Sequence, residues 1–323
     1  MQQQHFYEER IPFAISQLRS DKQVPTLTKH FDGGQCRVFK VDFVGGESWA
    51  VRVPLFVRNA SQDTIIHLIG SEVRALEELE IKGFWWAAKL RGCSLTFDNA
   101  VGYPFIALTW IPGSQLSWSD DFPTRPIRDK VLSQVAAIHA SLIEYTKETH
   151  HFMRIIQNKF RRVRSGLLPE ITEQDCLDQM NILPGVLLPE LNKAPFAMDH
   201  GDLSPQNILI DAQHNITGII DWGFSAKVPF QQAASFPRIL RLQDISLPPS
   251  LVLQTDRETY IASLQFQISQ ARKWMALVLS LEDVDFRVCF LESIISKGMH
   301  QSLACKKWEV PPCKKRAMDE EKI

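Results

Sequence analysis

Residues 200–222 read HGDLSPQNILIDAQHNITGIIDW, and this stretch decides the fold. Two apolar runs rich in β-branched residues, 208–210 and 216–220, flank a polar segment at 212–215. Short β-branched runs on either side of a polar turn are typical of a β-hairpin. We therefore predict a hairpin here, with its turn at 212–215.

The register of this hairpin brings polar side chains together at its open end. With the turn so centred, Asp211 faces Ile216, and counting outward along the ladder puts Asn207 beside Ile220 and Asp221. An amide oxygen and a carboxylate then lie within about 5 Å of each other across the strands. Such a pair of hard oxygen donors suits Mg²⁺, which completes its coordination shell with water and phosphate.

A third polar residue stands five positions before Asn207. Asp202 and Asn207 have the Asp-x-x-x-x-Asn spacing of a kinase catalytic loop, in which the aspartate accepts the proton of the attacking hydroxyl. The alternative is that Asp202 and Asn207 only cap a loop and that Asp221 only ends a strand, since these residue types favour turns. The combination with the hairpin favours the catalytic interpretation.

The N-terminal third of the chain contains a sheet and a helix. Residues 35–54 read as two strands around Gly45 and Gly46, because paired glycines supply the positive φ angles of a tight turn. Residues 61–83 then repeat apolar side chains at helical spacing. Glu72 lies within this apolar stripe, and a carboxylate in such a place needs a cation as its partner.

The remainder of the chain is rich in helical patterns. A strand at 104–110 ends at a Pro-Gly turn, where we place a domain boundary, and helices are expected at 127–145 and over 256–304. The predicted domains are therefore an N-terminal lobe at 1–111, a helical C-terminal lobe at 112–304 and a charged, disordered tail at 305–323.

Composition excludes several classes of protein. In the 323 residues, lysine plus arginine (36) nearly balance aspartate plus glutamate (37), so no large field of one sign indicates nucleic acid or an anionic membrane as a partner. The six cysteines include no CxxC pair, the first residues lack the apolar segment of a secretory signal, and no apolar run is long enough to cross a bilayer. We expect a cytoplasmic protein, and nothing in the sequence indicates its oligomeric state.

These motifs together resemble the aminoglycoside phosphotransferase and choline kinase-like family, in particular its fungal phosphotransferase-family members. The resemblance covers most of the chain, in these segments: a glycine-bearing strand at Phe31–Phe43, WAVRVP, SEVRALEEL, TWIPG, HGDLSPQNIL and GIIDW. It implies an α+β, bilobal, protein-kinase-like fold with a small antiparallel-sheet N-lobe and a larger helical C-lobe. It also implies ATP and Mg²⁺ as cofactors and a small-molecule acceptor.

The same resemblance assigns roles to individual residues. Asp202 is the catalytic aspartate, Asn207 and Asp221 are the magnesium ligands, Arg52 contacts the α and β phosphates, and Glu72 orients Arg52. Arginine stands here where kinases usually carry lysine, and a planar fork places phosphate oxygens differently from a point charge. The alternative for Arg52 is an ordinary surface residue of a strand.

The remaining nucleotide contacts rest on weaker patterns. Gly33 and Gly34 are followed by Gln35 and Cys36, which is neither GxGxxG nor a P-loop, so these backbone amides either approach phosphate or belong to an ordinary turn. By the resemblance, Thr109 to Ile111 lend backbone groups to adenine.

Three functions compete. The first is a kinase that transfers the γ-phosphoryl group of ATP to a hydroxyl of a small molecule. The second is a catalytically weak, nucleotide-binding pseudokinase, suggested by Arg52 and the poor glycine loop. The third is a protein kinase, against which Gly201 stands in the place of the HRD arginine and no APE sequence follows Asp221.

Overall fold

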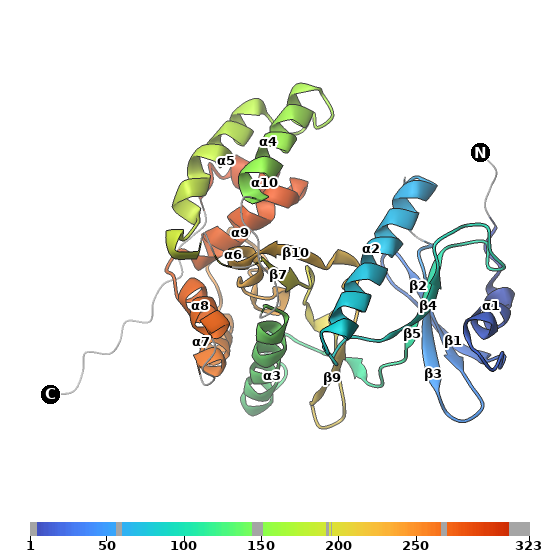
Figure 1. The fold of residues 1–323 in the computed structure, drawn as a ribbon. Helices are drawn as coiled ribbons and strands as arrows, with labels where there is room; N and C mark the ends of the chain where they lie inside the picture. Colours follow the sequence, from blue (N-terminus) through green and yellow to red (C-terminus); the bar gives the residue numbers. More distant parts are fainter. Residues whose placement is uncertain are drawn as a thin grey trace. The chain divides into compact units, whose positions relative to one another are not determined.

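The computed structural model describes residues 5–55, 60–143, 151–191, 194, 196–265 and 270–309. They form two compact units. The first unit comprises Met1–Leu116, His200–Asp202 and Gln206–Ser225, so it includes the hairpin predicted at 208–220. The second comprises Ser117–Asp199, Leu203–Pro205 and Ala226–Ile323. Each unit has its own elements and its own core (Figure 1).

A five-stranded antiparallel sheet forms the body of the first unit, in the order β1-β2-β3-β5-β4. The predicted hairpin is present, because β2 pairs with β3 across a turn in which Gly45 and Gly46 have φ angles of 112° and 90°. Only glycine adopts such angles without strain. The strands are β1 (Thr26–Asp32), β2 (Arg37–Asp42), β3 (Ser48–Val53), β4 (Leu90–Ser94) and β5 (Phe105–Thr109).

The expected single strand at Phe31–Phe43 is instead the junction of two strands. Strand β1 ends at Asp32 and β2 begins at Arg37, and the intervening turn closes with a bond from the Gly33 N–H to the Cys36 carbonyl (2.8 Å). The two glycines therefore lie in a turn, because the chain reverses there to pair β1 with β2.

The two faces of this sheet pack against different helices. Val51 and Ala107 pair across β3 and β5, and both belong to the core that α1 (Ile11–Leu18) covers. The next pair, Arg52 and Ile106, points to the opposite face because side chains alternate along a strand. Ile106 packs there against α2 (Gln62–Ile81). Figure 1 shows α1 and α2 on opposite sides of the sheet.

Helix α2 follows the pattern predicted for residues 61–83. Ser61 caps its N-terminus by accepting a hydrogen bond from the Thr64 N–H (3.2 Å), and Lys82 follows its last turn. Its buried positions recur at helical spacing and include Glu72.

The hairpin at 208–219 is present with one change of register. Strands β8 (Ile208–Ile210) and β9 (Ile216–Ile219) pair antiparallel, and β8 also pairs with β6 (Ser114–Gln115). Ile210, not Asp211, faces Ile216, because a bulge shifts the register by one residue near the turn. Asp211 instead closes the turn, donating its N–H to the Asn215 carbonyl (3.0 Å).

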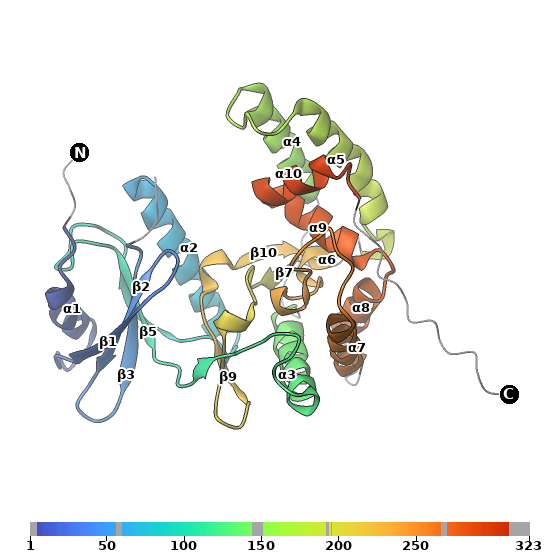
Figure 2. The same cartoon turned by 180° about the vertical axis from the view of Figure 1, so that it is seen from behind.

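The second unit is mainly helical. Figure 2 shows α3 beside α7 and α4 beside α5, and both pairs are in contact. A two-stranded sheet of β7 and β10 adds to them. Its helices and strands are α3 (Arg125–Ile143), α4 (His151–Arg164), α5 (Glu173–Val186), η2 (Pro189–Leu191), β7 (Phe196–Asp199), β10 (Ala226–Pro229), α6 (Phe230–Ala233), η5 (Arg238–Leu240), α7 (Leu251–Gln265), α8 (Gln270–Leu279), α9 (Val284–Ile295) and α10 (Lys297–Cys305).

The structure describes residues 305–309, the first part of the predicted C-terminal tail. Cys305 is the last residue of α10, and the Trp308 ring packs edge-on against His300 and near Phe290. Residues 310–323 of that predicted tail lie outside the described residues. Among the helices that the structure describes, none combines the length and the apolar character needed to cross a membrane.

Candidate active site

The cation expected beside Glu72 is Arg52. Arg52 projects from β3 toward α2, and its Nη1 donates a hydrogen bond to Glu72 Oε1. Only 4% of the Glu72 side chain and 14% of the Arg52 side chain are exposed. A buried carboxylate between apolar residues of α2 therefore has the partner that the sequence demanded.

The same guanidinium also reaches Asp221. Arg52 Nη2 donates to Asp221 Oδ1 over 2.7 Å, and 35% of the Asp221 side chain is exposed. Asp221 directly precedes the short turn η4 (Trp222–Phe224), which contacts α2. The buried Trp222 ring packs edge-on against Phe84 and next to His200, which holds this turn in place.

The electrostatics of this cluster favour a permanently charged arginine. Burial disfavours its charge, but Glu72, Cys36 and Asp221 more than compensate and raise the pKa of Arg52 above its usual range. Burial raises the pKa of the Glu72 carboxyl, while Arg52 opposes that change. Glu72 and Asp221 thus share one cation, and Arg52 stays protonated.

The turn between β1 and β2 also contributes to this cluster. Cys36 is buried, and its thiol lies within hydrogen-bonding reach of the Arg52 guanidinium. Burial raises the pKa of the Cys36 thiol, so it faces Arg52 as a neutral group. Gly34 has open space around it: a β-carbon there meets nothing within 4 Å.

Asp202 and Asn207 lie in direct contact. Asn207 Nδ2 donates to the Asp202 carbonyl (2.8 Å) and to Asp202 Oδ2 (3.2 Å), which turns the Asn207 amide oxygen away from Asp202. His200 anchors the loop, because its Nε2 donates to the Ile220 carbonyl (3.0 Å) and its Nδ1 accepts from the Asp202 N–H (3.3 Å). Gly201 has φ +79°, and a β-carbon there would lie 2.4 Å from the Phe224 carbonyl oxygen.

The hairpin joins this loop to Asp221. The Ile220 N–H donates to the Asn207 carbonyl over 3.0 Å, so Asn207 lies beside Ile220 as the outer register predicted. No group of three or more His, Cys, Asp or Glu side chains suited to a metal occurs among the described residues. One amide and one carboxylate are nonetheless a fitting donor set for Mg²⁺, which keeps several water and phosphate ligands of its own.

Thr109 and Ile111, the two residues expected to contact adenine at the end of β5, differ in their backbone hydrogen bonds. The Thr109 N–H donates to the Lys89 carbonyl (2.9 Å), and the Trp110 N–H donates to the Ser48 carbonyl (3.0 Å). Within the described part of the chain, no backbone hydrogen bond involves the N–H or C=O of Ile111. Ile111 packs instead on Gly218, where a β-carbon would lie 2.7 Å from its methyl groups.

Three residues at this site were not singled out from the sequence. Cys36 touches Arg52, His200 holds the Asp202 loop, and Gly223 lets the chain pass close to the ion cluster. A β-carbon at Gly223 would lie 3.4 Å from Arg52 Nη2 and 3.5 Å from Asp221 Oδ1. In the sequence His200 lies two residues before Asp202, and Gly223 lies two residues after Asp221. This proximity to the two aspartates was the signal that could have identified them.

A protein-family model matches this chain. The family model described as "Phosphotransferase enzyme family" matches residues 43–231, which is more than half of the chain. The matched range includes Arg52, Glu72, Asp202, Asn207 and Asp221. The glycine turn at 33–34 precedes it.

Curated proteins provide one distant relative. The "Clavilactone A biosynthesis cluster protein Y" of the fungus Ampulloclitocybe clavipes is 22% identical over 178 residues. The match covers 53% of this chain and 43% of that protein, so it spans less than half of the relative's length.

Solved structures share the fold at low sequence identity. A Ralstonia eutropha JMP134 protein described as a candidate aminoglycoside phosphotransferase has a TM-score of 0.60 at 16% identity, covering 93% of this chain and 91% of its own. The streptomycin–ATP–APH(2'')-IIa ternary complex has a TM-score of 0.55 at 13% identity, covering 87% and 90%. At such identities the likeness shows the fold alone, and it confirms the predicted α+β, protein-kinase-like fold.

Proposed function

We propose that this chain, which belongs to the phosphotransferase enzyme family, transfers the γ-phosphoryl group of ATP to a hydroxyl of a small molecule. The observation that carries the proposal is a connected set of contacts. Arg52 joins Glu72 to Asp221, Asn207 contacts Asp202, and the Ile220 N–H bonds to the Asn207 carbonyl. Five polar residues from three stretches of the sequence, at 52, 72 and 202–221, are thereby linked within one unit.

Each residue has a role in this proposal. Asp202 accepts the proton of the acceptor hydroxyl as its oxygen attacks the γ-phosphorus, and the bond to the β–γ bridging oxygen breaks to release ADP. Arg52 holds the α and β phosphates, and Glu72 keeps Arg52 in place. Asn207 and Asp221 hold Mg²⁺, which neutralises charge on the phosphates when it is bound.

The remaining contacts of the nucleotide follow from the same proposal. The backbone of Ile111 offers free groups to the adenine, whereas the Thr109 N–H is already used within the sheet. Gly33 and Gly34 lie in the turn whose Cys36 is near Arg52. The Gly33 N–H is already bonded to the Cys36 carbonyl, so the Gly34 amide is the one we propose to approach phosphate. Two structures similar to this chain are complexes of other phosphotransferases, one with streptomycin and ATP and one with kanamycin and GDP, and they support a small-molecule acceptor and a purine nucleotide. We also propose the cytoplasm as the compartment, as the cysteine pattern suggested.

A nucleotide-binding protein without turnover is the second candidate. The observation that favours it is that Asp221 Oδ1, an atom proposed to face the metal, already accepts a hydrogen bond from Arg52. Against it stands the retention of Asp202, Asn207 and Asp221 with the contacts described above.

The test is turnover by the purified chain. ADP release from Mg²⁺–ATP is measured across a panel of hydroxylated and amino metabolites, and the mass of the product identifies the acceptor. Asp202→Ala is expected to lower the acceptor-stimulated rate by about 10²- to 10⁴-fold, the usual contribution of a general base, with nucleotide binding retained.

A matched control lies on the same hairpin. Asp211 closes the turn through its Oδ1, which accepts from the Gln213 and Asn215 N–H groups, and Asp211→Asn keeps that acceptor oxygen. The control is expected to leave the rate unchanged. A rate in Asp202→Ala equal to that of the wild type would reject the assignment of the base, and nucleotide binding without any turnover would favour the second candidate.

A further inference from the structure

Arg52 divides its two terminal nitrogens between acids in unlike surroundings. Nη1 bonds to Glu72, which is almost wholly buried, and Nη2 bonds to Asp221, which is about one-third exposed. The Cys36 thiol is a further group that interacts with the guanidinium. Glu72 cannot lose its cation without leaving a buried charge unpaired. Asp221 is therefore the partner that Arg52 can exchange.

Space beside this exchangeable bond is left by a glycine. A β-carbon at Gly223 would lie 3.4 Å from Arg52 Nη2 and 3.5 Å from Asp221 Oδ1. The absence of a side chain at Gly223 thus leaves room for at least a methyl-sized group beside the bonded pair of atoms. A group that approaches from there meets a guanidinium N–H donor and a carboxylate oxygen together.

A divalent cation and Arg52 compete for the same carboxylate. A metal bound by Asp221 has the guanidinium charge as a close neighbour, and like charges at a few ångströms repel strongly at a partly buried site. A phosphate oxygen on Nη2 satisfies the donor in place of Asp221 and neutralises the arginine. Asp221 Oδ1 is then released toward the metal.

We propose that Arg52 couples metal loading at Asp221 to nucleotide binding: the guanidinium holds Asp221 until nucleotide phosphate replaces the carboxylate on Nη2. This inference rests on the proposed function, since it takes Asp221 as a metal ligand and Arg52 as a phosphate ligand. Because such coupling is reciprocal, each ligand tightens the binding of the other. The metal by itself binds weakly.

The identity of residue 52 sets this coupling. An arginine presents two nitrogens in a rigid fork and spans Glu72 and Asp221 at once, whereas a lysine carries one compact ammonium group. In Arg52→Lys the ammonium stays with the buried Glu72, and Asp221 is left free to bind a metal without nucleotide.

The experiment measures Mn²⁺ binding by the full chain, using electron paramagnetic resonance with Mn²⁺ as the probe. Mn²⁺ alone is expected to bind about tenfold more tightly to Arg52→Lys than to the wild type, within the usual range of coupling between sites. Arg19→Lys is the matched control, because Arg19 also spans two carboxylates of the first unit, Asp21 and Glu47, and both are exposed. The control is expected to bind Mn²⁺ as the wild type does.

Two results would overturn the proposal in different ways. Equal affinity of Arg52→Lys and wild type for Mn²⁺ alone, with clear Mn²⁺ binding in the presence of ADP, rejects the coupling and keeps the metal site. No Mn²⁺ binding with or without ADP rejects the metal site of the proposed function as well.

A second measurement needs no metal. With a chelator present, Asp221→Asn is expected to bind ADP several-fold more tightly than the wild type, because the competitor for Arg52 Nη2 is weakened. In the Arg52→Lys background the same change should have little effect, and the double-mutant cycle separates competition at Nη2 from the general loss of a negative charge. An equal gain in both backgrounds contradicts the exchange.

Discussion

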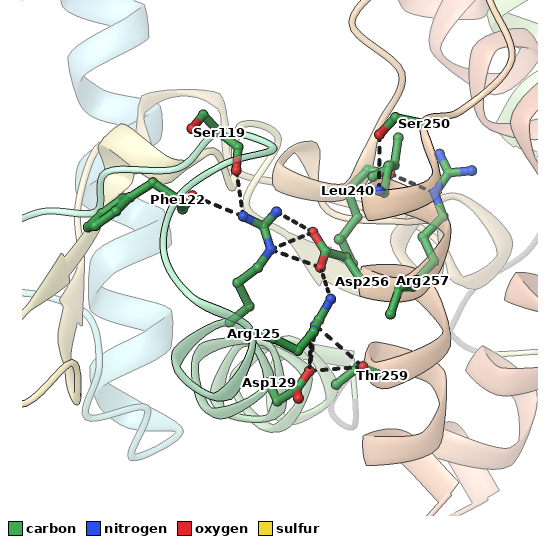
Figure 3. Close-up of polar contacts among 12 residues, drawn as sticks. Ser119, Phe122, Arg125, Asp129, Leu240, Ser250, Asp256, Arg257 and Thr259 are labelled. Carbon is green, nitrogen blue, oxygen red and sulfur yellow. Dashed lines mark hydrogen bonds and ion pairs between the residues drawn. The ribbon is translucent and has the colours of Figure 1, made fainter.

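Each unit of this protein has a buried arginine cluster, and the two clusters differ in how completely they are closed. In the second unit Arg128 uses Nε and Nη2 on both oxygens of Asp256, and its Nη1 donates to the Ser119 and Phe122 carbonyls. Arg125 adds a second cation to Asp256 over 2.7 Å (Figure 3). The side chains of Arg128 and Asp256 are 4% and 1% exposed.

The cluster of the first unit is open on one side. Arg52 bonds to the buried Glu72, but its second acid, Asp221, is 35% exposed and lies beside Gly223. In the closed cluster every guanidinium nitrogen of Arg128 has an acceptor within the protein, so these bonds stabilise the fold. An open cluster keeps one bond that a ligand can replace. Both clusters contain ion pairs, so an ion pair alone does not distinguish a structural charge from a functional one. The difference lies in how deeply the pair is buried and in whether a ligand can replace one partner.

The largest effect is expected where the closed cluster is broken. Asp256→Ala removes the acid that Arg125 and Arg128 share and leaves Arg128 buried without a carboxylate. We expect the free energy of unfolding to fall by about 3–5 kcal/mol, the usual cost of breaking a buried pair, as measured by urea denaturation. Asp129→Ala, which removes an exposed partner of Arg125, should cost less than about 1 kcal/mol. Equal losses in both variants would contradict the distinction.

A second kind of buried cation is Lys159, which has no carboxylate partner among the residues that the structure describes. Lys159 Nζ donates to Gln179 Oε1 (3.1 Å), the Ser293 carbonyl (2.7 Å) and His300 Nδ1 (3.1 Å), and burial lowers the pKa of Lys159 to about 8. Between pH 8 and the unfolded value near 10.5, the unfolded chain holds a proton that the folded chain has lost. Stability therefore rises with pH in this window.

The Lys159 effect is measured as a difference between two proteins. The free energy of unfolding of the wild type, relative to Lys159→Met, should rise by about 3 kcal/mol from pH 7.5 to 10.5. Taking the difference cancels the opposite contribution of the buried thiols and of Tyr260, whose raised pKa values favour folding less as the pH rises. A difference that stays constant with pH would show that Lys159 keeps its proton.

The open cluster is tested by neutralising its buried acid. Glu72→Gln keeps the size of the side chain but weakens the hold on Arg52, so the guanidinium shifts toward Asp221. Phosphoryl transfer is expected to fall about 10- to 100-fold, as for other residues that position a ligand-binding group. The measurement is the steady-state rate with the acceptor found in the metabolite screen. Full activity in this variant would show that Glu72 is not needed to position Arg52 for phosphoryl transfer.

The smallest effect is expected at the end of the helix that carries Glu72. Ser61→Ala removes the cap of α2 and should cost about 1 kcal/mol of unfolding free energy. Thr172→Ala, at the capping box of α5 in the second unit, is its counterpart. Activity per folded molecule should not change in either variant. A loss of activity in Ser61→Ala alone would show that the end of α2 affects the position of Glu72 in the open cluster.

Much of the secondary structure was predictable because its signals are local. The turn at Gly45 and Gly46, the stripe of α2 and the two runs of the β8–β9 hairpin each lie within about twenty residues of sequence. The bulge that moved Asp211 out of register was not predictable, since nothing in the local pattern marks it. The first strand and the short α1 also escaped prediction, because a strand with mostly exposed residues and an eight-residue helix carry weak periodicity. The domain limits at 111 and 304 stay predictions.

The candidate site was predictable in part for the same reason. Asp202 and Asn207 are five residues apart, and Asn207 meets Ile220 across a short hairpin, so their proximity follows from nearby sequence. Glu72 could be identified because it lies within the apolar stripe of a predicted helix, where a carboxylate needs a cation. The contact of Cys36 with Arg52 could not be found this way, because a lone cysteine beside a glycine turn has no pattern of its own.

Local sequence was enough to predict several of the elements, the polar residues of the site and the need of Glu72 for a partner, since hydrophobic period, turn chemistry and the cost of a buried charge act over short stretches. Only the tertiary structure decided that Arg52 is shared with Asp221, 169 residues away, and that Arg128 is closed off by Asp256, 128 residues away. Both choices depend on which surfaces the packing of helices and strands brings together and which it leaves in contact with water. That depends on the whole chain.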